Sequence, residues 1–161
     1  MFLKEFEIRW SDIDANRHLA NAAYLHYTGH SRMSYLAQLG FNQKTMAQYQ
    51  IGPIVFYEHM YYFKEVFIGR PVRVSTELKG MSEDGMFFEF QHNFYDADGK
   101  NFAHSEMMGA WMDLKARKLT PLPQAFLDAV DKMEKAEDFR RITKEDTRRF
   151  GKIPKYLKPH P

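Results

Sequence analysis

Residues 9–32 decide the fold of this chain and read R-W-S-D-I-D-A-N-R-H-L-A-N-A-A-Y-L-H-Y-T-G-H-S-R. Apolar and polar residues alternate before Asp12, which is typical of a strand, whereas tyrosines recur at helical spacing after Ala22. The stretch therefore predicts a strand, a short connection and a long helix. Asp14 falls in the connection, next to the place where a helix begins with unpaired backbone N–H groups.

The pattern beyond this stretch predicts an antiparallel sheet around one helix. The helix should cover residues 22–39, because Gly40 can adopt the left-handed conformation that ends a helix. Alternation over residues 72–79, 86–94 and 102–114 indicates strands with one buried face and one solvent-exposed face. Glu89 falls on an exposed face by this pattern. A hairpin turn is expected at Asp98-Gly99, with a positive φ angle at Gly99.

Composition limits the class of protein. The chain has 161 residues, 44% hydrophobic and 16% aromatic, which is enough for one well-packed domain. A net charge of +2 argues against a nucleic-acid-binding protein, and the absence of cysteine excludes disulfides and thiolate metal sites. The charged N-terminus and the lack of a long apolar run predict a cytoplasmic protein with no membrane partner.

The order of these motifs resembles a known family. Asp12-Ile13-Asp14 is followed by a histidine and an asparagine and then by a Tyr-Leu helix, and the later turns and strands fall in the same order up to residue 123. This is similar to the hotdog-fold acyl-CoA thioesterases of the 4-hydroxybenzoyl-CoA thioesterase type. The resemblance implies an α+β hotdog domain over residues 1–123, in which a sheet of about five strands wraps around one long central helix. It implies no cofactor and no metal ion.

The resemblance also assigns roles in the loop before the helix. It implies that Asp14 is the catalytic acid, which either attacks the thioester carbon or takes a proton from water, while Asp12 is structural. The backbone N–H of Asn21 matches the oxyanion donor. The residues alone allow a second interpretation, in which Asp14 only accepts backbone hydrogen bonds in a turn. His18 either contacts the reacting groups or ties down the loop.

Substrate contacts are predicted at two further places. Tyr24, in the first turns of the helix, is a candidate for contact with the substrate. Lys64, Arg70 and Arg73 flank the turn at Gly69 and are candidates for contact with the phosphates of coenzyme A.

Residues 124–161 lie outside the resemblance. The sequence predicts a short helix here, followed by a basic extension. The extension contains these basic residues: Arg140, Arg141, Lys144, Arg148, Arg149, Lys152, Lys155 and Lys158. It is interpreted as a solvated, partly ordered segment in preference to a phosphate-binding one.

The sequence therefore predicts an acyl-CoA thioesterase that releases a carboxylic acid and free coenzyme A. A homodimer or homotetramer is expected, because a sheet with one helix leaves an edge and an apolar face to be covered. The family's H-x-N-N reads His18-Leu19-Ala20-Asn21 here, and Gly29 and His30 replace an acidic pair. Two alternatives therefore stay open: an acyl-carrier-protein thioesterase, and a non-catalytic acyl-binding or scaffolding hotdog protein.

Overall fold

The structure, a computed structural model, describes residues 1–157, so Lys158 of the predicted basic extension lies outside the described residues. Its helices are α1 (Asn21–Gln38), α2 (Gln43–Tyr49) and α3 (Gln124–Val130). Its strands are β1 (Leu3–Phe6), β2 (Ile51–Tyr62), β3 (Val72–Ser75), β4 (Glu77–Met81), β5 (Phe87–Tyr95), β6 (Asn101–Asp113), β7 (Lys118–Leu119) and β8 (Lys135–Arg141). Two 3₁₀ turns cover Trp10–Asp12 and Glu145–Arg148. None of the helices in this described part is long and apolar enough to cross a membrane.

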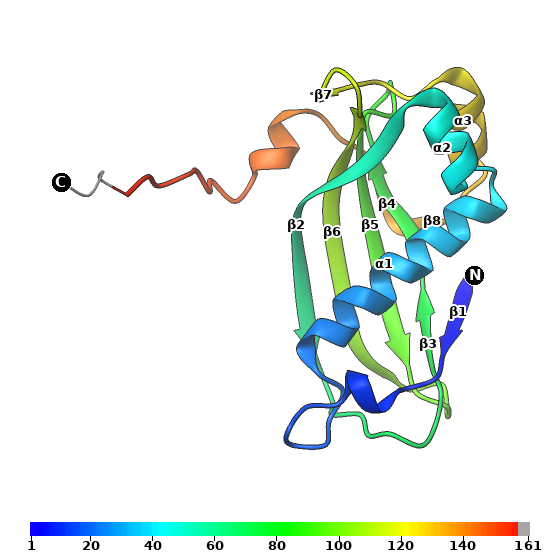
Figure 1. Cartoon of the computed structure of the whole chain (residues 1–161), viewed down its shortest axis with the longest axis vertical. Coiled ribbons are helices and arrows are strands. Elements are labelled where there is room, and N and C mark those ends of the chain that lie inside the picture. The colour runs from blue at the N-terminus through cyan, green and yellow to red at the C-terminus, as the bar shows by residue number, and fades with distance from the viewer. Residues whose placement is uncertain (158–161) are drawn as a thin grey trace.

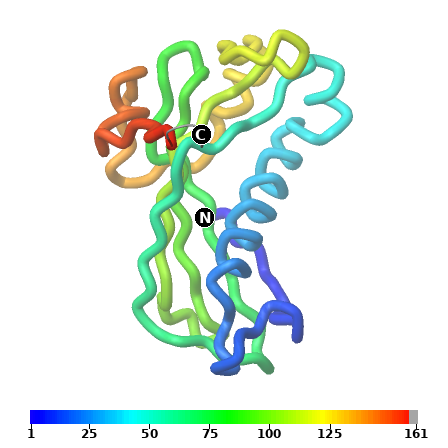
Figure 2. The backbone as a smooth tube through the Cα atoms, turned by 60° about the vertical axis from the view of Figure 1, so that its left-hand side comes forward, coloured from blue at the N-terminus to red at the C-terminus, as the bar shows by residue number. Residues whose placement is uncertain are grey.

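One curled sheet carries α1 across one face (Figure 1). Strand β6 lies between β2 and β5, and β5 pairs with both β3 and β4, which follow each other along the chain. At the far side β1 pairs with β3, and β8 pairs in parallel with β4. The predicted antiparallel sheet around a central helix is therefore confirmed. Figure 2 shows from a second direction that α1 runs along the sheet.

The strand predicted over residues 72–79 is divided at Thr76. This residue is fully buried, and its hydroxyl group lies 2.7 Å from that of Ser31 on α1. Segment β3 pairs with the N-terminal strand, whereas β4 pairs with the C-terminal one. The strand is therefore divided because its two halves pair with different strands, β1 and β8. Alternation of apolar and polar residues predicts a strand but not the strands with which it pairs.

Apolar side chains between α1 and the sheet form the core. Side chains alternate between the two faces of a strand, so Phe88 and Phe90 of β5 share one face and Glu89 lies on the other. The two phenylalanines face the helix. They pack with Trp111 of β6 and Leu36 of α1, all buried. This packing fixes the direction of α1 and so the position of its first turn.

Strand β2 forms a free edge and contains a bulge at Phe56. Its register against β6 shifts between Val55 and Tyr57. A Cβ atom on Gly109 of β6 would lie 2.4 Å from the carbonyl oxygen of Ile54, so only glycine permits this close approach. The other edge of β2 pairs with no strand in the described residues. The bulge turns part of β2 away from a regular ladder.

The C-terminal extension packs against the face of the sheet opposite α1. Glu89 of β5 is fully buried there, and its carboxylate binds the guanidinium groups of Arg140, at 3.2 Å, and Arg149. Arg140 also pairs with Asp146 at 2.8 Å. The expected exposure of Glu89 is therefore wrong. The physical reason is that the buried carboxylate requires cations, which the extension supplies. Residues 135–149 are ordered and include strand β8, although most of their side chains are exposed, as expected for a solvated segment.

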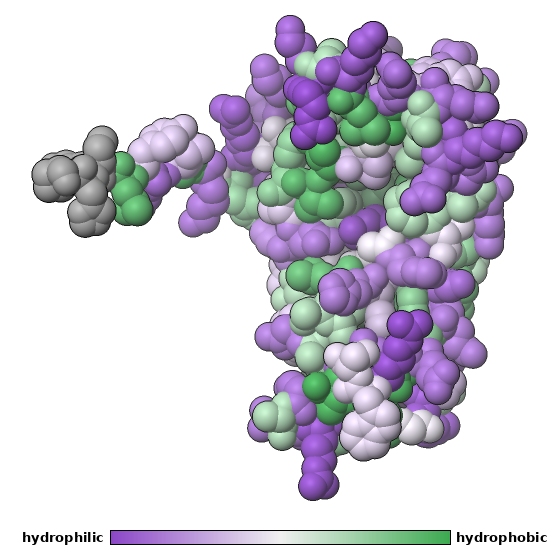
Figure 3. Space-filling view, in the orientation of Figure 1, coloured by the Kyte–Doolittle hydropathy of each residue, from purple (hydrophilic) through white to green (hydrophobic). Residues whose placement is uncertain are grey.

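The chain leaves the body after this contact. Gly151 has a φ angle of +61°, and the extended segment that follows projects beyond β2 (Figure 1). Ile153, Tyr156 and Leu157 are exposed. Figure 3 shows apolar side chains scattered among polar ones on the face that carries α1.

We expect Arg149→Ala to lower the free energy of unfolding by about 2 kcal/mol, because the buried carboxylate of Glu89 then keeps only Arg140 as a partner. The loss is moderate because the Arg149 side chain is itself partly exposed to water. Arg148→Ala is the matched control, since its exposed side chain has no ion pair among the described residues. It should change stability by less than about 0.5 kcal/mol. Urea unfolding measures the stability of both variants, and equal losses in the two would contradict a stabilising ion pair between Arg149 and Glu89.

Candidate functional site

Asp14 is held by a tight turn that leaves one carboxylate oxygen free. Its Oδ1 accepts the backbone N–H groups of Asn16, at 2.8 Å, and His18, at 3.1 Å. The backbone N–H of Asp14 donates to the carbonyl oxygen of His18, and Arg17 completes the turn with a φ angle of +65°. The second oxygen, Oδ2, accepts no hydrogen bond within residues 1–157. Asp14 therefore has both the backbone contacts of a turn and an oxygen available for chemistry.

Asp12 ties this loop to the helix. Its Oδ2 accepts the hydroxyl group of Tyr27 at 2.8 Å and the backbone N–H of Arg9 at 3.0 Å. Its carbonyl oxygen accepts the N–H of Ala20 at 2.8 Å. Burial, followed by the hydrogen bond to Asp12, raises the pKa of Tyr27, so the phenol remains a donor at neutral pH. Tyr27 was not among the predicted site residues, although its place one turn after Tyr24 is visible in the sequence.

The first turn of α1 lacks a side-chain cap. The helix begins at Asn21 after Ala20, whose methyl group cannot accept a hydrogen bond. The N–H group of Ala23 binds the carbonyl oxygen of Ala20, but the N–H of Asn21 has no side-chain acceptor in the described chain. An uncapped helix start presents donors and a partial positive charge to a ligand oxygen.

Asp14 and the helix start open into one cavity of about 320 Å³. Its lining residues are Asp14, His18, Leu19, Asn21, Tyr24, Tyr62, Phe63, Lys64 and Glu65. The rings of Tyr24 and Tyr62 meet edge to face with centroids 5.0 Å apart. Burial, followed by the nearby Tyr62 and Asp14, raises the pKa of Tyr24 to about 12. The cavity therefore combines a carboxylate, helix N–H groups and neutral phenols.

His18 lines this cavity, but its imidazole does not bind the Asp14 carboxylate. The ring nitrogen Nε2 lies 3.1 Å from the carboxylate of Glu65, and the ring meets Phe67 edge to face at 5.0 Å. Only the backbone N–H of His18 donates to Asp14. The side chain therefore lines the cavity while paired with Glu65, and the backbone shapes the turn.

The three predicted phosphate contacts lie in different surroundings. Lys64 lines the Asp14 cavity and has no ion pair within the described residues. Arg70 makes two hydrogen bonds to the carboxylate of Asp98, at 2.9 and 3.0 Å. Arg73 donates to the carbonyl oxygen of Asp96 at 3.2 Å. The two arginines therefore brace the β5–β6 hairpin, and Arg70 lines a neighbouring cavity that also includes Lys64.

A buried polar network lies between α1 and the sheet, and no motif or periodicity in the sequence predicts it. Arg32 of α1 donates to Glu58 at 3.1 Å and to Nε2 of His92 at 3.2 Å. Because arginine only donates, Nε2 accepts, and the proton on Nδ1 of His92 is donated to the carbonyl oxygen of Ser75 at 2.8 Å. Burial, followed by the charge of Arg32, lowers the pKa of His92 to about 3. The imidazole is therefore neutral.

Comparison with known proteins identifies the family. A family model described as the thioesterase-like superfamily matches residues 8–130. The chain therefore belongs to the thioesterase-like superfamily, which confirms the predicted resemblance to a thioesterase family. In sequence the chain is similar to an L-carnitine dehydrogenase/betainyl-CoA thioesterase of Agrobacterium fabrum, with 25% identity over 139 residues. That match covers 84% of this chain and 28% of the relative, so the chain spans under a third of its length.

Solved structures share the fold. A 1,4-dihydroxy-2-naphthoyl-CoA thioesterase from Synechocystis aligns with a TM-score of 0.72 at 16% identity, over 81% of this chain and 96% of the other. A protein from Staphylococcus aureus, solved in complex with CoA, aligns with a TM-score of 0.76 at 17% identity, over 97% and 95%. These likenesses confirm the predicted hotdog architecture.

We expect acid to destabilise the protein through His92. In the unfolded chain this residue takes up a proton as the pH falls through 6.5, whereas the folded residue does so only near pH 3. Its contribution to stability is therefore complete above pH 6.5 and is lost as the pH falls toward 3, at up to about 1.4 kcal/mol per pH unit.

The comparison is urea unfolding of the wild type and His92→Gln at pH 6.5, 5.5 and 4.5, the range below the ordinary histidine pKa of 6.5. The variant should show a shallower loss of stability with acid. His26→Gln, at an exposed position on α1, serves as the control and should retain the wild-type slope. Parallel slopes for the wild type and His92→Gln would contradict a neutral buried imidazole.

Proposed function

We propose that this protein hydrolyses an acyl-CoA thioester to a carboxylic acid and free coenzyme A. The observation that carries the proposal is the shared cavity of Asp14 and the uncapped start of α1. A thioester carbonyl placed there has its oxygen beside the Asn21 N–H, while the free Oδ2 of Asp14 faces the carbonyl carbon. One such backbone donor is worth about 3 kcal/mol when it stabilises a developing oxyanion.

Two routes for the reaction use the same groups. In one, Asp14 takes a proton from water, the hydroxide adds to the carbonyl carbon, and coenzyme A leaves as a thiolate that is then protonated. In the other, Oδ2 itself adds to the carbon, the thiolate leaves, and water cleaves the resulting anhydride. Both routes place negative charge on the carbonyl oxygen. The turn supports both, because it binds Oδ1 and leaves Oδ2 without a partner in the described chain.

We also propose that a homodimer or homotetramer completes the site. Strand β2 has a free edge in the described residues and ends at Tyr62. Tyr62 and the residue after it, Phe63, line the cavity and are at least half exposed. A cavity of about 320 Å³ lies at the small end of the range for ligand sites, so a second subunit along β2 would add the missing wall. Tyr24 and Tyr62 would form the aromatic side of the acyl site. Light scattering at micromolar concentration tests the assembly.

We expect Asp14→Asn to lower turnover by at least about 100-fold while the protein stays folded, because the change removes the charge but keeps the size and the turn. Asp12→Asn should instead lower stability, since Asp12 accepts the Tyr27 hydroxyl. Thiol release from a panel of acyl-CoA esters, including betainyl-CoA and 1,4-dihydroxy-2-naphthoyl-CoA, measures turnover. Each acyl group is also supplied on acyl carrier protein. Wild-type turnover by Asp14→Asn would refute the mechanism, and an inactive wild type would favour the non-catalytic alternative.

We expect Lys64→Ala to raise the KM for acyl-CoA with little change in kcat, because a phosphate contact remote from the carbonyl contributes equally to substrate and transition-state binding. The effect should shrink as salt screens the charge. Arg70→Ala and Arg73→Ala in the same assay measure the other proposed phosphate contacts. An unchanged KM in Lys64→Ala, with a raised KM in the arginine variants, would contradict the Lys64 contact and indicate that the phosphates bind at the neighbouring cavity lined by Arg70.

A further inference from the structure

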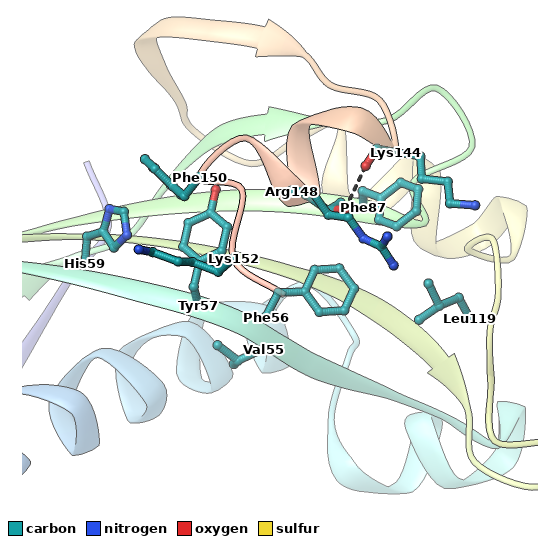
Figure 4. A pocket seen from close by; sticks show the side chains of 11 residues that line it. Val55, Phe56, Tyr57, His59, Phe87, Leu119, Lys144, Arg148, Phe150 and Lys152 are labelled. Carbon is teal, nitrogen blue, oxygen red and sulfur yellow. Dashed lines mark hydrogen bonds between the residues drawn. The ribbon is translucent and has the colours of Figure 1, made fainter. Parts of the chain in front are cut away.

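A second and larger cavity lies on the face of the sheet opposite α1. It has a volume of about 600 Å³ and lies between β2 and the C-terminal segment (Figure 4). Its lining includes the apolar residues Val55, Phe56 and Leu119 and the basic residues Lys144, Arg148 and Lys152. It shares no lining residue with the Asp14 cavity. The site proposed for thioester hydrolysis therefore does not account for it.

The floor of this cavity is apolar and open. Val55 is 49% exposed, Phe56 40% and Leu119 39%, which is unusual for three large apolar residues at one place. The rings of Phe56 and Phe87 lie with centroids 6.5 Å apart along the floor. The bulge at Phe56 contributes to this exposure, because it turns the residue out of the regular ladder.

The rim of the cavity is cationic. Lys144, Arg148 and Lys152 line it, and no aspartate or glutamate does. Within residues 1–157 none of these three side chains has an ion pair. The hydroxyl group of Thr147 donates to the carbonyl oxygen of Lys144 at 2.7 Å, shown by the dashed line in Figure 4, which holds the turn that carries Lys144 and Arg148.

The rim is fixed by the folded structure. Arg149, next to Arg148, binds the buried Glu89 and so anchors the turn to the sheet. Phe150 packs against the rings of Tyr57, at 5.1 Å, and His59, at 4.4 Å. The backbone that carries Lys144 and Arg148 is therefore anchored beside the apolar floor.

We propose that this cavity binds an amphipathic anion, in which an apolar chain or ring carries a carboxylate or phosphate at one end. The apolar body covers Val55, Phe56 and Leu119, and the anionic head pairs with Arg148 and Lys144. The size suits such a ligand, because small-molecule sites range from about 300 to 1,000 Å³. A cationic ligand of the same shape should be repelled, because the side chains at the rim are basic and none is acidic. The inference does not depend on the thioesterase activity.

The test is calorimetric titration of the full chain with two probes that share a tail and differ in charge. Dodecanoate, below its micelle concentration, should bind with one site per chain, and added salt should weaken it. Dodecyltrimethylammonium should not bind. Dodecyl phosphate and free coenzyme A identify the source of the anion. Binding of the alkyl anions alone assigns a lipid-like ligand. Because the Asp14 cavity is also proposed to bind coenzyme A, this probe assigns a nucleotide only if its binding weakens when the charges of Lys144 and Arg148 are reversed. Asp14→Asn should bind dodecanoate like the wild type, which separates this site from the proposed catalytic one.

Two variants locate the site. The double change Lys144→Glu and Arg148→Glu should raise the dissociation constant for dodecanoate at least about tenfold, because it reverses charge at the rim. Lys44→Glu, on the exposed side of α2, is the matched control and should leave binding unchanged. Phe56→Ser tests the floor independently and should also weaken binding. Equal binding of both charged probes, no binding of either anion class, or wild-type affinity in both site variants would overturn the proposal.

Discussion

The hydrogen bond from the Tyr27 hydroxyl to the Asp12 carboxylate is the contact on which the proposed site depends. Tyr27 is buried in the core, so a shift of the helix would cost packing. Its hydrogen bond to Asp12 therefore fixes the position of the loop relative to the helix. The carbonyl group of Asp12 then holds Ala20, the residue before the helix. Asp14, two residues along, lies beside the start of α1 as a result. The carboxylate and the backbone donor to which we assign the proposed chemistry are thus placed by one buried phenol and a short turn.

The two faces of the sheet carry different kinds of surface, and β2 contributes to both. At its C-terminal end Tyr62 completes the Asp14 cavity, whereas Val55 and Phe56 near its other end form the apolar floor on the opposite side. The buried Glu89 explains why the second face has an ordered cover, because its charge is stable only with the arginines of the extension. The basic extension is therefore part of the fold, and three of its other cations, Lys144, Arg148 and Lys152, lie at the rim of the second cavity.

Sequence periodicity predicted the core elements closely because they obey local rules. The helix expected over residues 22–39 is observed as Asn21–Gln38, and Gly99 has the expected positive φ angle. Strand β8 was not predicted, since a basic segment resembles a solvated one unless its buried partner is known. Alternation placed Glu89 on an exposed face, and only the tertiary structure shows what covers it. Asp14 was found through its motif, whereas the pairing of His18 with Glu65 and the Arg32–His92 contact join residues far apart in the sequence.

The central claim is that Asp14 and the first turn of α1 act on one thioester carbonyl. A crystal structure with an acyl-CoA analogue that has a methylene group between sulfur and carbonyl tests it most directly, because the analogue keeps the carbonyl but cannot be hydrolysed. The account predicts the carbonyl oxygen within about 3 Å of the Asn21 nitrogen and the free Oδ2 of Asp14 facing the carbonyl carbon or a water beside it. A carbonyl bound away from both groups, in this cavity or elsewhere, would contradict it.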